Sequence, residues 1–493
     1  MLIRQSVNTF IRIYDGGEFG YITNQLTCQD RVYDQTGAEF LKQITRQPQS
    51  IDDIIERLCA IYGEGNRHSI QHDFKAFAND LADLHFVNMG KTEDELNQND
   101  ILFTYEVDNP KTLAIDFTQS NTQGSRTTQD YLLQHDRKRP RLACLQIELT
   151  SRCNERCIHC YIPNASKDKG CYLSFEHFKN IIDQFSEMNG LIVGLTGGEA
   201  LMNKDFIPML RYCRKKDLKI TLLSNLTLLN DEIVKALKET NVSLVQVSLY
   251  SMNHDIHDAI TKQRGSFIRT KNAIEKLRKE DVPVLISCPV MRANRKDYIP
   301  VMDYAHSMKM QAQTDYVMMA ESNFDNHNLT NRLSLKETEE LLHDMMSHDR
   351  IENLAPQESM PLAVSSKEEL EGMPMCGAGI NDLSISAEGN VYPCAGWEGY
   401  VVGNVFNQSL KEIWETSTKL NEIRKIKHKD FPKCLDCEAQ DFCNMCLVRN
   451  YNESHGDMFK INNHFCKVVF LNKRLVEEWM KKKESKLSEV NDR

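Results

Sequence analysis

The chain has no long apolar segment and no excess of positive charge. Hydrophobic side chains make up 41% of its 493 residues, but no apolar run approaches the roughly 18 residues of a membrane-spanning helix. Residues 1–8 lack the apolar core of a signal peptide. The formal net charge of −10 argues against a broad nucleic-acid-binding surface. These absences predict a cytoplasmic protein that binds neither membranes nor nucleic acid.

Cysteine, in contrast, is abundant, and three cysteines form a specific pattern. In a reducing compartment, 16 cysteines indicate metal binding rather than disulfides. Cys153, Cys157 and Cys160 follow C-x3-C-x2-C spacing. Three thiolates can hold three irons of a [4Fe–4S] cube, and the open fourth iron can pass an electron to S-adenosylmethionine (SAM). Zinc motifs more often use C-x2-C pairs, so a zinc knot is the weaker alternative.

A second motif, Gly197-Gly198-Glu199, ends an apolar run that predicts a buried strand over residues 191–196. The two glycines let the backbone approach a ligand closely, and Glu199 offers a carboxylate to an ammonium group. Alone, this motif usually marks a turn. Its position, one helical segment after Cys160, makes the pair of motifs specific.

With both motifs in place, the chain resembles the radical SAM superfamily. The resemblance implies that the three cysteines bind the cluster and that the fourth iron takes the amino and carboxylate groups of SAM. It also implies that the glycine–glutamate motif contacts the SAM amino group and that Tyr161 lies along the adenine. By the same resemblance, the SAM ribose or carboxylate lies near Ser224, Asn225, Ser248 and Arg264. Each of these four could instead be a capping or loop residue.

Strand and helix patterns alternate over residues 142–321, the predicted radical SAM core. The strand candidates are 143–150, 190–196, 219–224, 243–250, 284–291 and 313–319. Six such repeats predict an α/β fold with a parallel sheet, helices outside, and functional groups at the C-terminal strand ends. This count agrees with the partial (β/α)6 barrel of the superfamily.

Residues 1–90 predict a small α+β, winged-helix-like domain. Strand patterns at 10–14, 19–23 and 31–33 precede three helical segments, and D-x-T-G-A opens the first helix. This order resembles the PqqD-like domain, which binds the leader of a precursor peptide as an extra strand at a sheet edge. A generic structural domain is the alternative. Polar linkers are predicted over 91–141, which includes a short basic cluster, and over 322–374, with one helix at 334–346.

A cysteine-rich domain is predicted over residues 375–470, followed by a charged tail over 471–493. Its seven cysteines are Cys376, Cys394, Cys434, Cys437, Cys443, Cys446 and Cys466. The arrangement resembles the SPASM domain, which holds auxiliary [4Fe–4S] clusters. One difference is that two residues, not three, separate Cys443 from Cys446. The other six cysteines are expected to be mostly small buried side chains.

The resemblance implies that Cys434, Cys437, Cys443 and Cys466 close one auxiliary cluster. Cys376, Cys394 and Cys446 then hold an inner cluster, giving three [4Fe–4S] clusters in all. No cysteine lies between Cys288 and Cys376 to complete the inner cluster. We therefore expect an open position there for a substrate thiolate, with water or another side chain as the alternative.

These features predict a radical SAM enzyme that modifies a ribosomal precursor peptide and forms Cys thioether crosslinks through a 5′-deoxyadenosyl radical. C–C crosslinking, epimerisation, or Ser/Cys oxidation of a protein are the enzymatic alternatives, and a zinc-rich peptide-binding scaffold is the non-enzymatic one. Sulfatase-maturing enzymes of this layout carry Asp after the second SPASM cysteine, whereas Ala395 follows Cys394 here. A flavodoxin- or ferredoxin-type protein is the expected electron donor. No catalytic acid or base stands out in the sequence.

Overall fold

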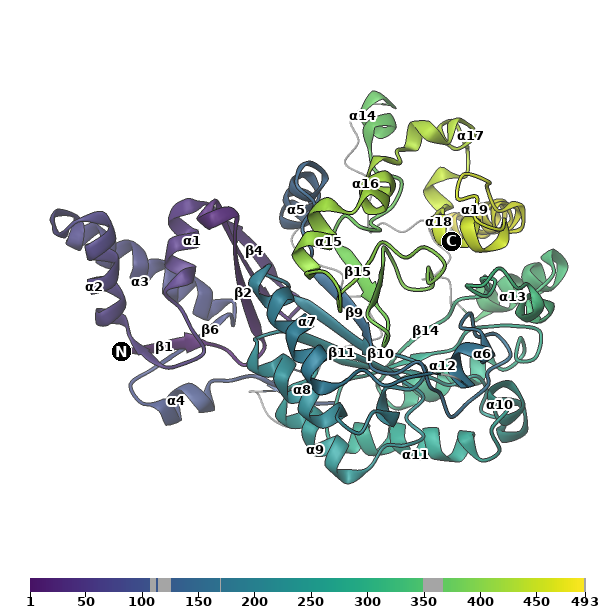
Figure 1. Cartoon of the computed structure of the whole chain (residues 1–493), viewed down its shortest axis with the longest axis horizontal. Helices are drawn as coiled ribbons and strands as arrows, with labels where there is room; N and C mark the ends of the chain where they lie inside the picture. Colours follow the sequence, from purple (N-terminus) through teal and green to yellow (C-terminus); the bar gives the residue numbers. More distant parts are fainter. Residues whose placement is uncertain (107–111, 114–125, 169, 349–366, 492–493) are drawn as a thin grey trace.

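A central sheet connects an N-terminal domain and a C-terminal cysteine-rich domain (Figure 1). The computed structural model describes residues 1–106, 112–113, 126–168, 170–348 and 367–491. Within these ranges, no helix combines the length and apolar character needed to cross a bilayer.

Six parallel strands form the centre of the molecule, in the order β14-β13-β12-β11-β10-β9. They are β9 (Cys144–Glu148), β10 (Ile192–Thr196), β11 (Lys219–Ser224), β12 (Leu244–Ser248), β13 (Val284–Ser287) and β14 (Gln311–Gln313). The helices between and beside them are α7 (Phe175–Glu187), α8 (Phe206–Lys215), α9 (Asp231–Glu239), α10 (His254–Thr261), α11 (Ser266–Lys279) and α12 (Tyr298–Ser307). The predicted α/β fold with a partial barrel is confirmed.

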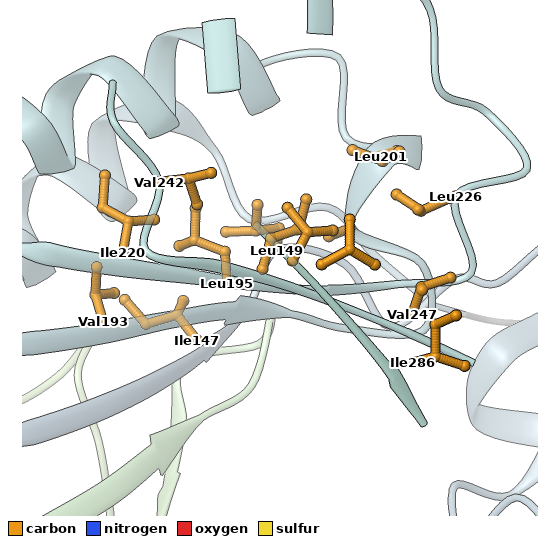
Figure 2. Close-up of a cluster of buried hydrophobic side chains, with 14 of the residues drawn as sticks. Ile147, Leu149, Val193, Leu195, Leu201, Ile220, Leu226, Val242, Val247 and Ile286 are labelled. Carbon is orange, nitrogen blue, oxygen red and sulfur yellow. The ribbon is translucent and has the colours of Figure 1, made fainter. Parts of the chain in front are cut away.

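The two faces of this sheet differ in chemistry because side chains alternate along each strand. On β9, Leu145 and Ile147 are buried against the helices, whereas Gln146 and Glu148 face the other side and are half-buried. Figure 2 shows the aliphatic cluster that joins neighbouring strands to the helix layer. The apolar face builds the core, and the more polar face lines the inside of the partial barrel.

The sixth strand differs from its prediction. A strand is predicted over residues 313–319, but β14 ends at Gln313. The side chain of Asp315 accepts a hydrogen bond from the Val317 amide at 2.7 Å, which turns the backbone out of the sheet. The apolar residues that follow are buried without belonging to a strand, so the hydrophobic pattern alone is misleading here.

The N-terminal domain has the predicted three strands followed by three helices. Strands β2 (Thr9–Tyr14), β3 (Phe19–Asn24) and β4 (Asp30–Tyr33) precede α1 (Gln35–Lys42), α2 (Ile51–Tyr62) and α3 (Arg67–Asp83). Asp34 caps α1 by accepting from the Gly37 amide. A second small sheet, β5-β1-β6, was not predicted; it comprises β1 (Leu2–Gln5), β5 (Gln49–Ser50) and β6 (Val87–Gly90).

A buried arginine fixes this domain on the barrel. Arg12 of β2 donates to the carbonyl of Gly190 at 2.8 Å and to that of Asp217 at 2.6 Å. Both acceptors precede barrel strands, so the β2 side of the domain faces the barrel. Strand β4 lies at the other end of the three-stranded sheet, beside α5 (Arg126–Lys138).

The C-terminal domain continues the barrel sheet, which the sequence did not predict. Strand β15 (Asp382–Ile385) pairs in parallel with β9. It forms the predicted hairpin with β16 (Asn390–Tyr392), and β17 (Gly403–Asn404) adds the last strand. Gly389 in the hairpin turn has a φ of +80°, a conformation that favours glycine.

Helices complete the C-terminal part of the chain. They are α14 (Lys367–Gly372), α15 (Leu410–Thr416), α16 (Thr418–Lys425), α17 (Pro432–Leu435), α18 (Leu447–Glu453) and α19 (Asn463–Asn491). α19 runs through the predicted boundary between the cysteine-rich domain and the tail, because Leu475 and Val476 are buried. It packs beside α13 (Leu335–Ser347). The range of α13 confirms the helix predicted over 334–346.

Tyr105 attaches the first linker to the barrel and gives a test of this packing. Its buried hydroxyl donates to the Val282 carbonyl at 3.0 Å and accepts from the Val284 amide at 2.8 Å. We expect Tyr105→Phe to lower the free energy of unfolding by about 1–3 kcal/mol, because it leaves buried backbone groups unpaired. Chemical denaturation measures this, with Tyr131→Phe at an exposed position as the control. Equal stability of the two variants would contradict the packing.

Candidate functional site

Cys153, Cys157 and Cys160 lie in the loop that leaves the C-terminal end of β9. Burial raises the pKa of the Cys153 thiol to about 12 and that of Cys157 well above its usual value. The Glu155 amide donates to the Cys153 sulfur at 3.4 Å, and the Tyr250 hydroxyl lies 3.9 Å from the Cys157 sulfur. The thiolate forms of Cys153 and Cys157 are therefore unfavourable unless an iron binds them.

Unpaired buried atoms in the same loop fit a bound group. Glu155 Oε1 and His159 Nδ1 are buried and have no hydrogen-bond partner among the described residues. The His159 ring packs edge-on against Tyr250 with centroids 4.9 Å apart. A cavity of about 390 Å³ lies beside the loop, and Cys157 and Cys160 are among the residues that line it.

The sulfurs do not converge on one point. Within the described ranges, no three His, Cys, Asp or Glu side chains meet as ligands of a single metal ion. A four-iron cube does not require such convergence, because each cysteine binds a different iron. The donor set of this loop therefore suits a cluster.

The two glycines of the second motif are needed for contact with the cysteine loop. A Cβ on Gly197 would lie 2.3 Å from the Thr150 carbonyl oxygen, and one on Gly198 would lie 2.2 Å from that of Arg152. The Gly198 amide donates to Thr150 and the Glu199 amide to Arg152, each at 2.8 Å. The turn thus holds the base of the cysteine loop by main-chain hydrogen bonds.

Glu199 lies buried at the end of the turn. Its carboxylate, 1% exposed, accepts from the Ser224 hydroxyl at 2.6 Å, the Asn225 amide at 2.8 Å and the Leu201 amide at 3.0 Å. Burial raises its pKa, and these donors oppose that shift. The carboxylate is therefore held by hydrogen bonds inside the protein.

Two of the predicted SAM-contacting residues, Ser224 and Asn225, contact Glu199, whereas others do not. The main-chain amide of Asn225 donates to Glu199, and its side chain donates to Asn154 of the cysteine loop at 2.9 Å. Ser248 ends β12 on the inner face, half-buried. Arg264 is exposed in the turn between α10 and α11, and no described contact joins its side chain to the other predicted residues.

Tyr161 connects the cysteine loop to the C-terminal domain. A Cβ on Gly396 would lie 3.7 Å from its ring. Burial raises its pKa well above the usual value, and the carboxyl groups of Glu398 and Glu148 add to the shift. Both Glu398 oxygens are buried without a hydrogen-bond partner in the described part of the chain. The sequence analysis missed Glu148, although strand alternation places it on the inner face; Glu398 has no recognisable sequence signal.

The seven C-terminal cysteines fall into two sets. Burial and the Asp382 carboxylate raise the pKa of the Cys394 thiol most, and the neighbouring Cys446 and Cys376 raise it further. Burial raises the pKa of the Cys443 thiol most. The neighbouring cysteines that raise it further are Cys434, Cys437 and Cys466. The resemblance to the SPASM domain implies the same two sets.

A cavity of about 240 Å³ reaches the inner set from the partial barrel. Its walls include Cys394 and Ala395 from the C-terminal domain and Gln146, Gly194 and Thr221 from the barrel strands.

Comparison with known proteins agrees with this organisation. Residues 147–305 match the radical SAM superfamily, and residues 376–438 match the SPASM iron–sulfur cluster-binding domain. The chain is therefore a radical SAM/SPASM enzyme that uses SAM and iron–sulfur clusters. Residues 32–87 match PqqD, the coenzyme PQQ synthesis protein D. Together the three domains identify a peptide maturase of this class with a PqqD-like domain, rather than a zinc scaffold.

Individual relatives share the same fold or parts of it. An AdoMet-dependent heme synthase of Methanosarcina barkeri is 29% identical over 62% of this chain and 90% of its own length. The subtilosin biosynthesis protein AlbA of Bacillus subtilis is 26% identical over 62% of this chain and 67% of its own length. The structure of Streptococcus suis SuiB bound to its precursor peptide SuiA has a TM-score of 0.60 at 16% identity, over 94% of this chain and 99% of SuiB.

The close contact between Gly198 and the Arg152 carbonyl can be tested by substitution. We expect Gly198→Ala to lose most of the iron bound by the cysteine loop, because the new Cβ displaces the Arg152 carbonyl. Gly194→Ala in the preceding strand is the control, since its Cβ meets only ordinary contacts from 3.4 Å outward. Iron and acid-labile sulfide analysis of both proteins decides, and unchanged iron in Gly198→Ala would contradict the contact.

Proposed function

We propose that this enzyme forms thioether bonds between Cys sulfur and a carbon atom of a precursor peptide. The observation that carries the proposal is the barrel cavity that opens onto Cys394, a member of a cysteine set with only three thiols. A peptide thiolate that enters this cavity can bind the iron that lacks a cysteine ligand. The small wall residue Ala395 leaves room for it.

The proposed ligand assignments follow the sulfur sets. Cys153, Cys157 and Cys160 hold the SAM-binding cluster; Cys376, Cys394 and Cys446 hold the inner auxiliary cluster; Cys434, Cys437, Cys443 and Cys466 hold the outer one. This gives three [4Fe–4S] clusters. When bound, the SAM-binding cluster and SAM supply the 5′-deoxyadenosyl radical that removes a hydrogen atom from the peptide.

The chain's own residues position and isolate the reactants. The main chain of Gly197 and Gly198 and the side chain of Ser248 line the place proposed for SAM, and Tyr161 separates it from the C-terminal domain. Glu199, Ser224 and Asn225 are proposed to hold the turn in place rather than to touch SAM. Such fixed positioning brings a reactive group within reach of one C–H bond and excludes water.

The PqqD-like domain is proposed to bind the leader of the precursor peptide at the β4 side of its sheet. Strand β2 at the other end faces the barrel through Arg12, so the β4 side is the better candidate for strand addition. C–C crosslinking and epimerisation remain the alternative products. A flavodoxin- or ferredoxin-type protein is the proposed electron donor, and the cytoplasm the proposed location.

Iron counting tests the ligand assignments without any substrate. We expect about four irons to be lost per chain in each of three variants, one for each cysteine set, if each set holds one four-iron cube. Suitable double substitutions are Cys153→Ala/Cys157→Ala, Cys376→Ala/Cys394→Ala and Cys434→Ala/Cys437→Ala. The control is Cys213→Ala at a buried cysteine outside the sets, which keeps all iron. A variant that loses no iron would remove its set from the assignment.

Mass spectrometry of an anaerobic reaction tests the bond that forms. The reaction contains the enzyme, SAM, a reductant and a candidate Cys-containing precursor peptide. We expect the peptide to lose two hydrogens per crosslink together with one alkylatable thiol. The matched Cys→Ser peptide remains unchanged. The same mass loss with every thiol still free would instead favour C–C bonding.

A further inference from the structure

Helices α13 and α19 form the walls of a groove that borders the outer cysteine set. The groove has a volume of about 800 Å³, and the two helices pack against each other. Cys466, in the first turn of α19 and partly exposed, belongs to its wall, as does Glu438, which directly follows Cys437. The outer set therefore borders the protein surface at this groove, whereas the inner set borders the barrel cavity.

The groove carries a positive charge, unlike the chain as a whole. Its walls contain four cationic side chains and three glutamates, a formal charge of +1, whereas the whole chain carries −10. Each of the three glutamates forms an ion pair with Lys473 or Arg474. Lys336 and Lys467 are exposed and form no ion pair with the residues that the structure describes. These two lysines give the groove positive charge that no neighbouring carboxylate neutralises.

An exposed aromatic side chain lies on the same wall. Phe470 of α19 is 39% exposed. It follows Lys467 by three residues and precedes Arg474 by four, and residues at this spacing are neighbours on a helix surface. Aromatic residues and arginine are enriched at protein–protein interfaces. The α19 wall thus combines an aromatic side chain with positive charge beside Cys466, a composition that suits an acidic protein partner.

We propose that the groove between α13 and α19 docks an acidic one-electron carrier protein, which takes an electron from the outer cluster beside Cys466. The inference deepens the proposed function and rests on its assignment of Cys434, Cys437, Cys443 and Cys466 to that cluster. The electron carrier of this enzyme is thereby given a place on the surface and a charge.

The proposed crosslinking reaction requires such a carrier. Formation of the C–S bond breaks one C–H bond and one S–H bond of the peptide. The hydrogen atom goes to the 5′-deoxyadenosyl radical, the thiol proton goes to water, and one electron remains on the auxiliary clusters. The carrier accepts this electron and is reduced by one charge, while the outer cluster returns to its oxidised state.

Electron exchange with an acidic plant-type [2Fe–2S] ferredoxin tests the docking surface without SAM or peptide. The background protein carries Cys153→Ala, Cys157→Ala and Cys160→Ala, so that only the auxiliary clusters exchange electrons. Reduced ferredoxin is mixed with the oxidised protein, and stopped-flow absorbance gives the second-order rate constant at low and at high ionic strength. We expect Lys336→Glu/Lys467→Glu to lower this constant about tenfold or more at low ionic strength, because electrostatic steering of the carrier is lost.

Two matched controls accompany the groove variants. Lys235→Glu/Lys411→Glu makes the same charge change at exposed positions of α9 and α15 and keeps the background rate. Phe470→Ala lowers the rate constant about fivefold, because an aromatic anchor is lost from the interface. Phe406→Ala, at a side chain that is also 39% exposed, keeps the background rate. Iron analysis verifies that every variant retains its auxiliary clusters.

The proposal requires both groove variants to be slower than their controls, and an unchanged rate in either one overturns it. Absence of electron transfer to the background protein, or an equal loss of rate in Lys235→Glu/Lys411→Glu, also overturns it. Failure of the underlying cysteine assignment is recognised separately, because Cys434→Ala/Cys437→Ala would then retain its iron.

Discussion

The contact between the Gly197–Gly198 turn and residues 150–152 is the constraint on which the rest of the site depends. Two main-chain hydrogen bonds at 2.8 Å join the end of β10 to the start of the cysteine loop. No side chain fits between them, since any Cβ at these glycines would overlap a carbonyl oxygen. The Glu199 carboxylate then extends the same anchor to the end of β11. Three strand ends are thus fixed together before any cofactor binds.

Much of this organisation could be predicted from sequence because it depends on local patterns. Strand β11 is found with the predicted ends, and the helix predicted over 334–346 is found as α13. The cysteine spacings likewise carry the resemblance to the SPASM domain. In each case the determining residues lie within one segment of chain, where spacing and residue type carry the information.

The parts that could not be predicted depend on contacts between distant segments. Nothing near Glu199 shows that Ser224 and Asn225 will occupy its carboxylate. Nothing near Asp382 shows that its strand will pair with β9, which lies far earlier in the chain. The sixth strand was misplaced because an aspartate side chain, rather than the hydrophobic pattern, ends it. A buried segment without strand pairing has the same hydrophobic pattern in its sequence as a buried strand.

The pairing of β15 with β9 also has a consequence for how the chain is made. Until residues 382–385 leave the ribosome, the outer edge of β9 has unpaired amide and carbonyl groups. The six-stranded sheet is otherwise synthesised by then, so the β9 edge of a nascent chain is open and can join another chain. Truncated forms that end before β15 retain this edge permanently. The C-terminal domain therefore covers the β9 edge during synthesis, in addition to carrying its cysteines.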